Sequence, residues 1–144
     1  MNCTPESLHL LWKWFLQRAE TESVVYVDEE KHNNKISNSI WRKEKQLTLE
    51  TEYILRDIGM YLGETFRKNH PNIYWTYYTK PRKDFFVNHP ILKGFVDRTF
   101  NQPFEACFEP IHMAKIQATK VMDKTAKTVD LLNLYSIWAE KTYG

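Results

Sequence analysis

Two of the five histidines lie in the same short context, Asn-His-Pro, at His70 and His89. Together with His112 they could supply imidazole ligands to a metal ion, or an acid/base pair, because imidazole titrates near neutral pH. The alternative needs no chemistry: proline fixes φ and asparagine tolerates turn geometry, so both triplets also fit simple turns. No two histidines show a short ligand spacing, and we therefore predict neither a bound metal nor a cofactor.

A second set of polar side chains, Arg56, Asp57 and Glu64, falls on one predicted helix. Glu64 follows Gly63, and with Arg56 and Asp57 it could line a pocket where this helix meets a close neighbour. Alternatively, Arg56 and Asp57 are ordinary surface charges with partners four residues away. A pocket near Gly63, Glu64 and His89 would make the chain a small enzyme or a ligand-binding domain.

A strongly aromatic strand followed by a basic turn is the clearest candidate for binding. Residues 73–79 (IYWTYYT) alternate so that Ile73, Trp75 and Tyr77 share one face of a strand. The other face and the turn after it carry residue types that dominate binding hot spots. We predict that a partner binds at Tyr74, Tyr78, Lys80, Arg82 and Lys83. Burial of the rings is one alternative, and stacking of single-stranded nucleic acid on them is another.

The common catalytic fingerprints are absent from the chain. It has no GxGxxG, no GxxxxGK[ST], no GxSxG and no HExxH. The two cysteines, Cys3 and Cys107, have no CxxC or Cys/His context and are expected to be free thiols. The sequence therefore favours a protein that is not an enzyme, although an active site built from scattered residues stays open.

Four helices are predicted to hold these residues in place. Thr4 and Pro5 begin a helix that continues to about Glu22, and residues 48–69 give the strongest helical periodicity. Gly59 and Gly63 lie on one stripe of that second helix, where each costs about 1 kcal/mol relative to alanine, so another element should pack closely there. Pro110 opens a third helix, and Thr128 is expected to cap the last one.

The strands are predicted between the second and third helices. Residues 73–79 and 85–87 should form a hairpin, and residues 91–95 and 104–108 are two further short strands. Residues 23–27 are strand-like but could continue the first helix. The polar residues 28–46 should be either a mobile surface loop or a loop that contains a short helix around 36–45. The order of elements predicts one α+β domain over residues 1–144, with about four helices on a small, mainly antiparallel sheet centred on the 73–87 hairpin.

Composition limits the class of protein. The chain has 144 residues, of which 42% are hydrophobic and 15% aromatic, enough for one ordinary core. Its net charge is +2, and residues 73–100 alone contribute five basic and two acidic residues. The first apolar stretch is interrupted by Lys13 and is far shorter than the ~20 residues of a membrane span. We therefore expect a cytoplasmic protein without a membrane segment.

The middle third of the chain resembles known proteins in three short runs. Residues 56–64 (RDIGMYLGE), Tyr74-Trp75 and residues 90–95 (PILKGF) are similar to uncharacterised bacterial families in which a "YLGE" helix precedes a Trp-bearing strand. Such families resemble the small cytoplasmic immunity proteins of polymorphic toxin systems. The resemblance carries over no catalytic residue. It implies a bacterial protein that acts by binding another protein, and more specifically one that neutralises a toxin.

Overall fold

A computed structural model describes residues 2–27, 41–77, 90–99 and 101–142 of the chain. In this part of the chain four helices and two small antiparallel sheets confirm the predicted α+β class. The elements in order are α1 (Pro5–Arg18), β1 (Thr21–Val27), β2 (Trp41–Leu47), α2 (Leu49–Asn69), β3 (Tyr74–Tyr77), β4 (Pro90–Asp97), β5 (Phe104–Phe108), α3 (Pro110–Met122) and α4 (Asp130–Ala139).

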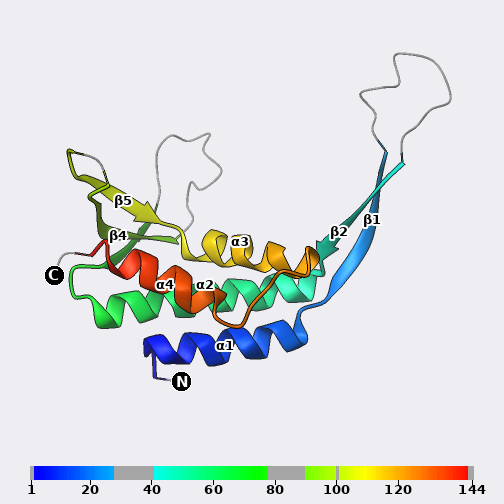
Figure 1. Cartoon of the computed structure of the whole chain (residues 1–144), viewed down its shortest axis with the longest axis horizontal. Coiled ribbons are helices and arrows are strands. Elements are labelled where there is room, and N and C mark those ends of the chain that lie inside the picture. Colours follow the sequence, from blue (N-terminus) through cyan, green and yellow to red (C-terminus); the bar gives the residue numbers. More distant parts are fainter. Residues whose placement is uncertain (1, 28–40, 78–89, 100, 143–144) are drawn as a thin grey trace, which may run out of the picture.

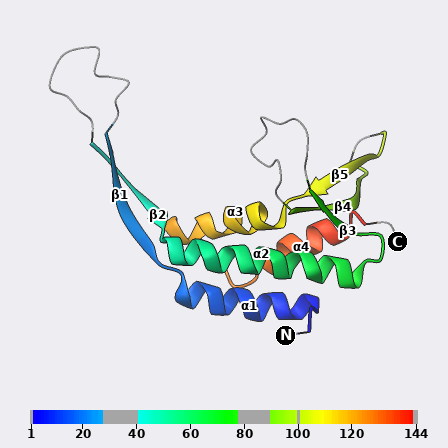
Figure 2. The same ribbon diagram turned by 180° about the vertical axis from the view of Figure 1, so that it is seen from behind.

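The helices form a bundle with one sheet at each end (Figure 1). Helix α2 packs against α1 and α3, and α1 also contacts α4. The ribbon formed by β1 and β2 extends away from one end of the bundle, and the sheet of β3, β4 and β5 lies at the other end (Figures 1 and 2). Seen from behind, α2 crosses the front of the molecule with β3 beside its C-terminal end (Figure 2).

The first two helices begin where their capping residues predict. The Thr4 side chain accepts a hydrogen bond from the Ser7 amide at 3.3 Å, and Thr48 accepts one from the Thr51 amide at the same distance. The expected end of the first helix at Glu22 is wrong, because Ala19 is already extended and the chain enters β1 at Thr21.

The residues that follow the first helix form a two-stranded ribbon. All seven residues of β1 pair antiparallel with β2, from Thr21 opposite Leu47 to Val27 opposite Trp41. The expectation of a loop or short helix is therefore wrong for residues 41–46, which are strand. The rest of the polar segment, residues 28–40, lies outside the described residues.

The three-stranded sheet has the order β3-β4-β5, so β4 is its central strand. Of the predicted central hairpin at 73–87, the structure describes β3, which is an outer strand among the described ones and pairs with β4, Tyr74 lying opposite Lys93. The predicted returning strand at 85–87 lies outside the described residues. The strands expected at 91–95 and 104–108 are confirmed as β4 and β5.

The last two helices follow the sheet in the predicted order. Pro110 occupies the first turn of α3, as expected. The expected cap at Thr128 is wrong: α4 begins one residue later, after Val129. Its first residue, the buried Asp130, uses its own carboxylate to accept a hydrogen bond from the Lys127 amide at 2.8 Å.

One core joins the bundle to the three-stranded sheet. It takes fully buried side chains from every helix and from β4 and β5, among them Leu8, Trp12, Phe15, Leu55, Leu62, Phe66, Leu92, Phe95, Phe108, Ala114, Ala118 and Leu131. Since both layers share these residues, the sheet is fixed relative to α2. No helix of the described residues is long and apolar enough to cross a membrane.

Candidate functional site

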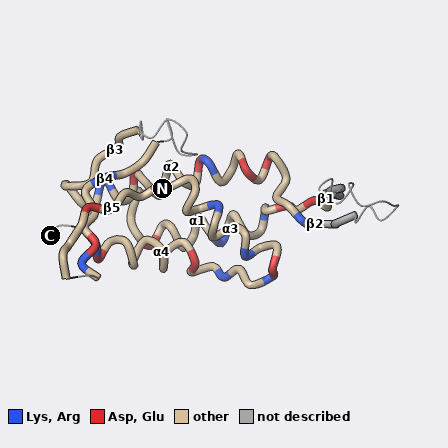
Figure 3. Tube along the Cα trace, turned by 90° about the horizontal axis from the view of Figure 1, so that it is seen from above, with Lys and Arg blue, Asp and Glu red and all other residues tan. Residues whose placement is uncertain are grey.

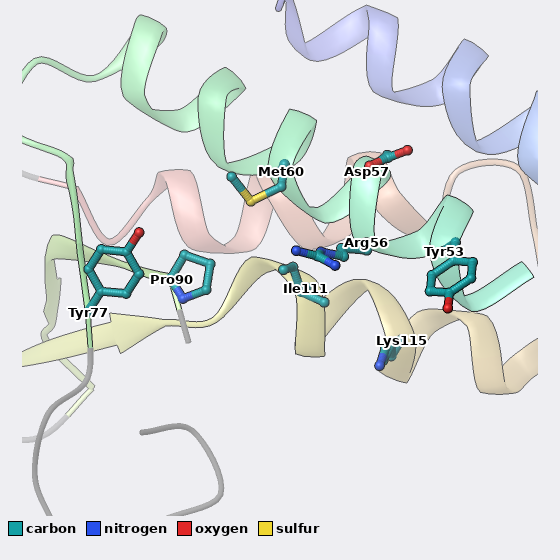
Figure 4. A pocket seen from close by; sticks show the side chains of 8 residues that line it. All are labelled: Tyr53, Arg56, Asp57, Met60, Tyr77, Pro90, Ile111 and Lys115. Carbon is teal, nitrogen blue, oxygen red and sulfur yellow. The ribbon is translucent and has the colours of Figure 1, made fainter. Parts of the chain in front are cut away.

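A groove of about 750 Å³ lies between α2 and α3 (Figure 4). Tyr53 and Lys115 lie toward one end of it, Arg56 and Ile111 near its middle, and Tyr77 at the other end. Among the described residues, the lining combines aromatic, aliphatic and charged side chains: Tyr53, Arg56, Asp57, Met60, Tyr77, Pro90, Ile111 and Lys115. We refer to it as the α2–α3 groove.

The two glycines of α2 allow neighbouring elements to approach this helix closely. A Cβ at Gly59 would lie 2.6 Å from the Cα of Ile111, so only glycine lets α3 approach α2 this closely. A Cβ at Gly63 would overlap the ring of Trp75 and come within 3.3 Å of Pro110. The close contact predicted from the glycine stripe is therefore confirmed, and it involves both α3 and β3.

Trp75 attaches strand β3 to α2. The Trp75 ring lies over Gly63, and its Nε1–H donates a 2.6 Å hydrogen bond to the Glu64 carboxylate. Arg67 donates to the same carboxylate from Nε and Nη2 at 2.8–3.2 Å. This attachment fixes the strand on the helix and thereby positions Tyr77 at the end of the groove.

Glu64 acts as the anionic partner of this attachment. The hydrogen bonds from Arg67 lower the pKa of its carboxyl group, against the opposing effect of partial burial. Gly63 is buried beneath Trp75, and His89 lies outside the described residues, so a pocket near Gly63, Glu64 and His89 stays a prediction. Arg56 and Asp57, in contrast, do line a groove where α2 meets its neighbour.

Only one of the residues predicted to bind a partner, Tyr74, lies in the described part of the chain. Its side chain is 52% exposed. The other four, Tyr78, Lys80, Arg82 and Lys83, lie outside the described residues. Tyr77 was not among the predicted binding residues, although it is 64% exposed and lines the groove. The alternation of residues along the strand predicted that Tyr77 shares a face with Trp75. The sequence does not show that α2 covers Trp75 and leaves the Tyr77 side chain exposed.

A second, apolar groove of about 260 Å³ lies on the other side of α2, against α1. Asp57 lies between the two grooves and lines both of them, and in Figure 4 its carboxylate points away from Ile111 and Lys115. The other residues that line this second groove are Leu11, Trp14, Ile54, Ile58 and Tyr61. The exposed face of α2 thus lies between two grooves, one against α3 and one against α1.

His70, one of the predicted metal or acid/base residues, belongs to a hydrogen-bonded network at the end of α2. The Thr142 hydroxyl donates to the Ala139 carbonyl at 2.9 Å and therefore accepts from Nδ1–H of His70 at 3.3 Å. This leaves Nε2 as the acceptor for the Tyr135 hydroxyl at 3.1 Å. Both nitrogens are thus occupied while the ring is neutral, and desolvation lowers the pKa of His70.

This network predicts a loss of stability in mild acid. An unfolded chain binds a proton at His70 near pH 6.5, whereas the folded chain does so only at lower pH because burial lowers the pKa. The free energy of unfolding should therefore decrease as the pH falls below about 6.5 and level off below the folded pKa. The His70→Asn variant should lose this slope. Urea denaturation between pH 5 and 8 measures it, and identical slopes in parent and variant would contradict the prediction.

The described residues offer no group of three His, Cys, Asp or Glu side chains that could hold a metal ion. His70 is engaged by Tyr135 and Thr142, and His112 lies on α3. What the α2–α3 groove presents instead is two tyrosine rings, a methionine and two cations, Arg56 and Lys115. Such a surface is suited to recognition through apolar contact and hydrogen bonds.

No protein-family model matches the chain, and no curated protein or solved structure is detectably similar to it.

Proposed function

We propose that this chain is a non-enzymatic protein-binding module whose partner docks in the α2–α3 groove. The observation that supports the proposal is the exposure of three large side chains in the α2–α3 groove. Tyr53 is 59%, Met60 39% and Tyr77 64% exposed, and Arg56 lies among them. Tyrosine, methionine and arginine are the residue types enriched at protein interfaces.

The groove is built on elements that are already ordered. Tyr53, Arg56 and Met60 stand on a helix of 21 residues, and Tyr77 is held by the contact of Trp75 with Gly63 and Glu64. A preformed surface spends little ordering entropy on binding, so more of the contact energy contributes to affinity. This supports recognition of a folded partner.

Charge indicates what the partner should carry. Arg56 on α2 and Lys115 on α3 lie on opposite walls of the groove, while the Asp57 carboxylate points away from Lys115 (Figure 4). We expect the partner to place an acidic side chain between two apolar ones. Helix α2 carries Asp and Glu beside its Lys and Arg, whereas α3 carries Lys115 and Lys120 and no acidic residue, so the α3 wall of the groove is the more basic one (Figure 3).

The more specific form of the proposal is an immunity-type protein of the bacterial cytoplasm that covers the active surface of a toxin. It rests on the resemblance of residues 56–64 and of the Trp75 strand, and three of those helix residues, Arg56, Asp57 and Met60, line the groove. Neutralisation would then be steric and electrostatic. Coexpression of the chain with the product of a neighbouring toxin gene tests this specific proposal. The chain should restore the growth of cells that produce the toxin.

The general proposal is tested by one matched pair of variants. A tagged chain is produced in its native host, the protein that copurifies in stoichiometric amount is identified, and its affinity is measured by titration calorimetry. Tyr77→Ala should weaken binding at least about 30-fold, because hot-spot truncations cost ~2 kcal/mol or more. Tyr74→Ala removes a similarly exposed ring from the same strand and should leave the affinity unchanged.

Other outcomes separate the alternatives. Loss of binding in Tyr74→Ala but not in Tyr77→Ala would move the interface to the face of β3 predicted from sequence. A small molecule retained in native mass spectra and lost in Arg56→Ala would favour the enzyme or ligand-binding alternative. Oligonucleotide binding that weakens steeply with salt would favour a single-stranded nucleic-acid binder that uses Lys80, Arg82 and Lys83.

A further inference from the structure

The β1–β2 ribbon is firmly held at its base and extends away from the bundle (Figures 1 and 2). At the base, the Thr48 amide donates to the Glu20 carbonyl at 3.0 Å, and the Glu20 amide donates to the Thr51 hydroxyl at 3.0 Å. Thr51 is buried in the first turn of α2. The direction in which the ribbon leaves the bundle is therefore fixed by the N-terminus of α2.

A ribbon of only two strands is marginal in water, because its backbone pairs on one side of each strand only. Within the described residues, β1 and β2 pair with each other and with no third strand. Each strand therefore has one edge of backbone groups that no described strand satisfies. Such an edge is a template for another chain.

The two edges differ in how well they are protected. Four consecutive residues of β2, from Arg42 to Lys45, are charged, and charged residues on an edge strand oppose pairing. Strand β1 has no charged residue from Ser23 to Val27, and four of these five are valine or tyrosine, both strong strand formers. The edge of β1 is thus the one suited to accept a strand.

We propose that β1 pairs antiparallel with β1 of a second copy, which joins two ribbons into one four-stranded sheet. Two-fold pairing about Val24 would place Glu22 opposite Tyr26 of the second copy, so no two like charges meet. The equivalent pairing of β2 about Glu44 would oppose Glu44 to itself and Lys43 to Lys45, which is destabilising. A two-fold contact closes on itself, so the product is a dimer and not a filament.

The test uses two variants from the same rung of the ribbon, since Val24 and Glu44 lie opposite each other. Light scattering and sedimentation are measured over a dilution series. The parent should reach about twice the chain mass of 17.3 kDa. Val24→Lys should stay monomeric at every concentration, because a lysine on the β1 edge opposes pairing. Glu44→Lys, which adds a lysine to the other strand, should dimerise as the parent does.

A second measurement locates the contact independently of the variants. Amide hydrogen exchange of residues 21–27 should slow as the concentration of the parent rises, whereas the Val24→Lys protein should show no such dependence. Circular dichroism checks that the helices of the variant are intact. A parent that is monomeric throughout, a dimeric Val24→Lys, or exchange of residues 21–27 that ignores concentration would each overturn the proposal. The groove at α2 plays no part in this contact.

Discussion

Replacing Phe66 by alanine should lower the free energy of unfolding by about 3–5 kcal/mol, the range for deleting a buried aromatic ring. Phe66 is fully buried, and its ring lies 4.5 Å from that of Tyr135, 5.1 Å from Phe108 and 5.2 Å from Phe95, centroid to centroid. It therefore joins α2 to α4 and to strands β4 and β5 of the three-stranded sheet. Urea denaturation of the variant and the parent measures the difference.

Two controls make this result specific to the core. Phe66→Leu keeps most of the apolar volume and should lose clearly less stability than the alanine variant. Tyr74→Ala removes an exposed ring and should change the free energy by no more than about 0.5 kcal/mol. A loss below about 1 kcal/mol in Phe66→Ala would show that the sheet and the bundle do not share one cooperative core.

The helices were predictable because their determinants are local. A cap, a proline in the first turn and apolar residues at helical spacing all lie within a few residues of one another, as at Thr4, Pro5 and Leu8. Likewise, the Thr48 cap and the apolar residues at helical spacing in α2 are local signals that predict this helix. The α+β class followed from the order of helices and strands.

Pairing between distant segments was not predictable in the same way. Residues 41–47 (WRKEKQL) are charged and lack strand-forming residues apart from Trp41, so propensity favours a loop or a helix there. They form β2 because β1 supplies a partner across the intervening segment. Likewise, nothing local to Tyr74 shows that its partner in the ladder is Lys93.

Only the α2 side of the candidate site could be predicted from the sequence. Gly59 and Gly63 indicated a close approach on α2, and Arg56 and Asp57 were weighed as pocket residues. The partners that complete the groove, Ile111 and Lys115, lie on a helix more than fifty residues away, and a single sequence carries no measure of that proximity. Two glycines on one stripe of a helix indicate that another element packs closely against it, but they do not identify that element.

Replacing Gly63 by alanine should destabilise the fold by about 1–3 kcal/mol, the usual cost of overpacking. In an open helix the same change would stabilise by up to ~1 kcal/mol, since glycine is the poorer helix former. The loss is expected because the new methyl group would overlap the Trp75 ring, which is held in place by Glu64. Thermal or urea denaturation gives the sign directly.

A double-mutant cycle identifies Trp75 as the cause. In a Trp75→Ala background the ring is gone, Pro110 is still 3.3 Å away, and Gly63→Ala should become neutral or stabilising. Gly59→Ala is the matched comparison on the same stripe. Its methyl group would meet the backbone of Ile111 at 2.6 Å, so its cost should persist in both backgrounds. A Gly63→Ala cost that is unchanged without Trp75 would show that this ring is not what holds β3, and with it Tyr77, against α2.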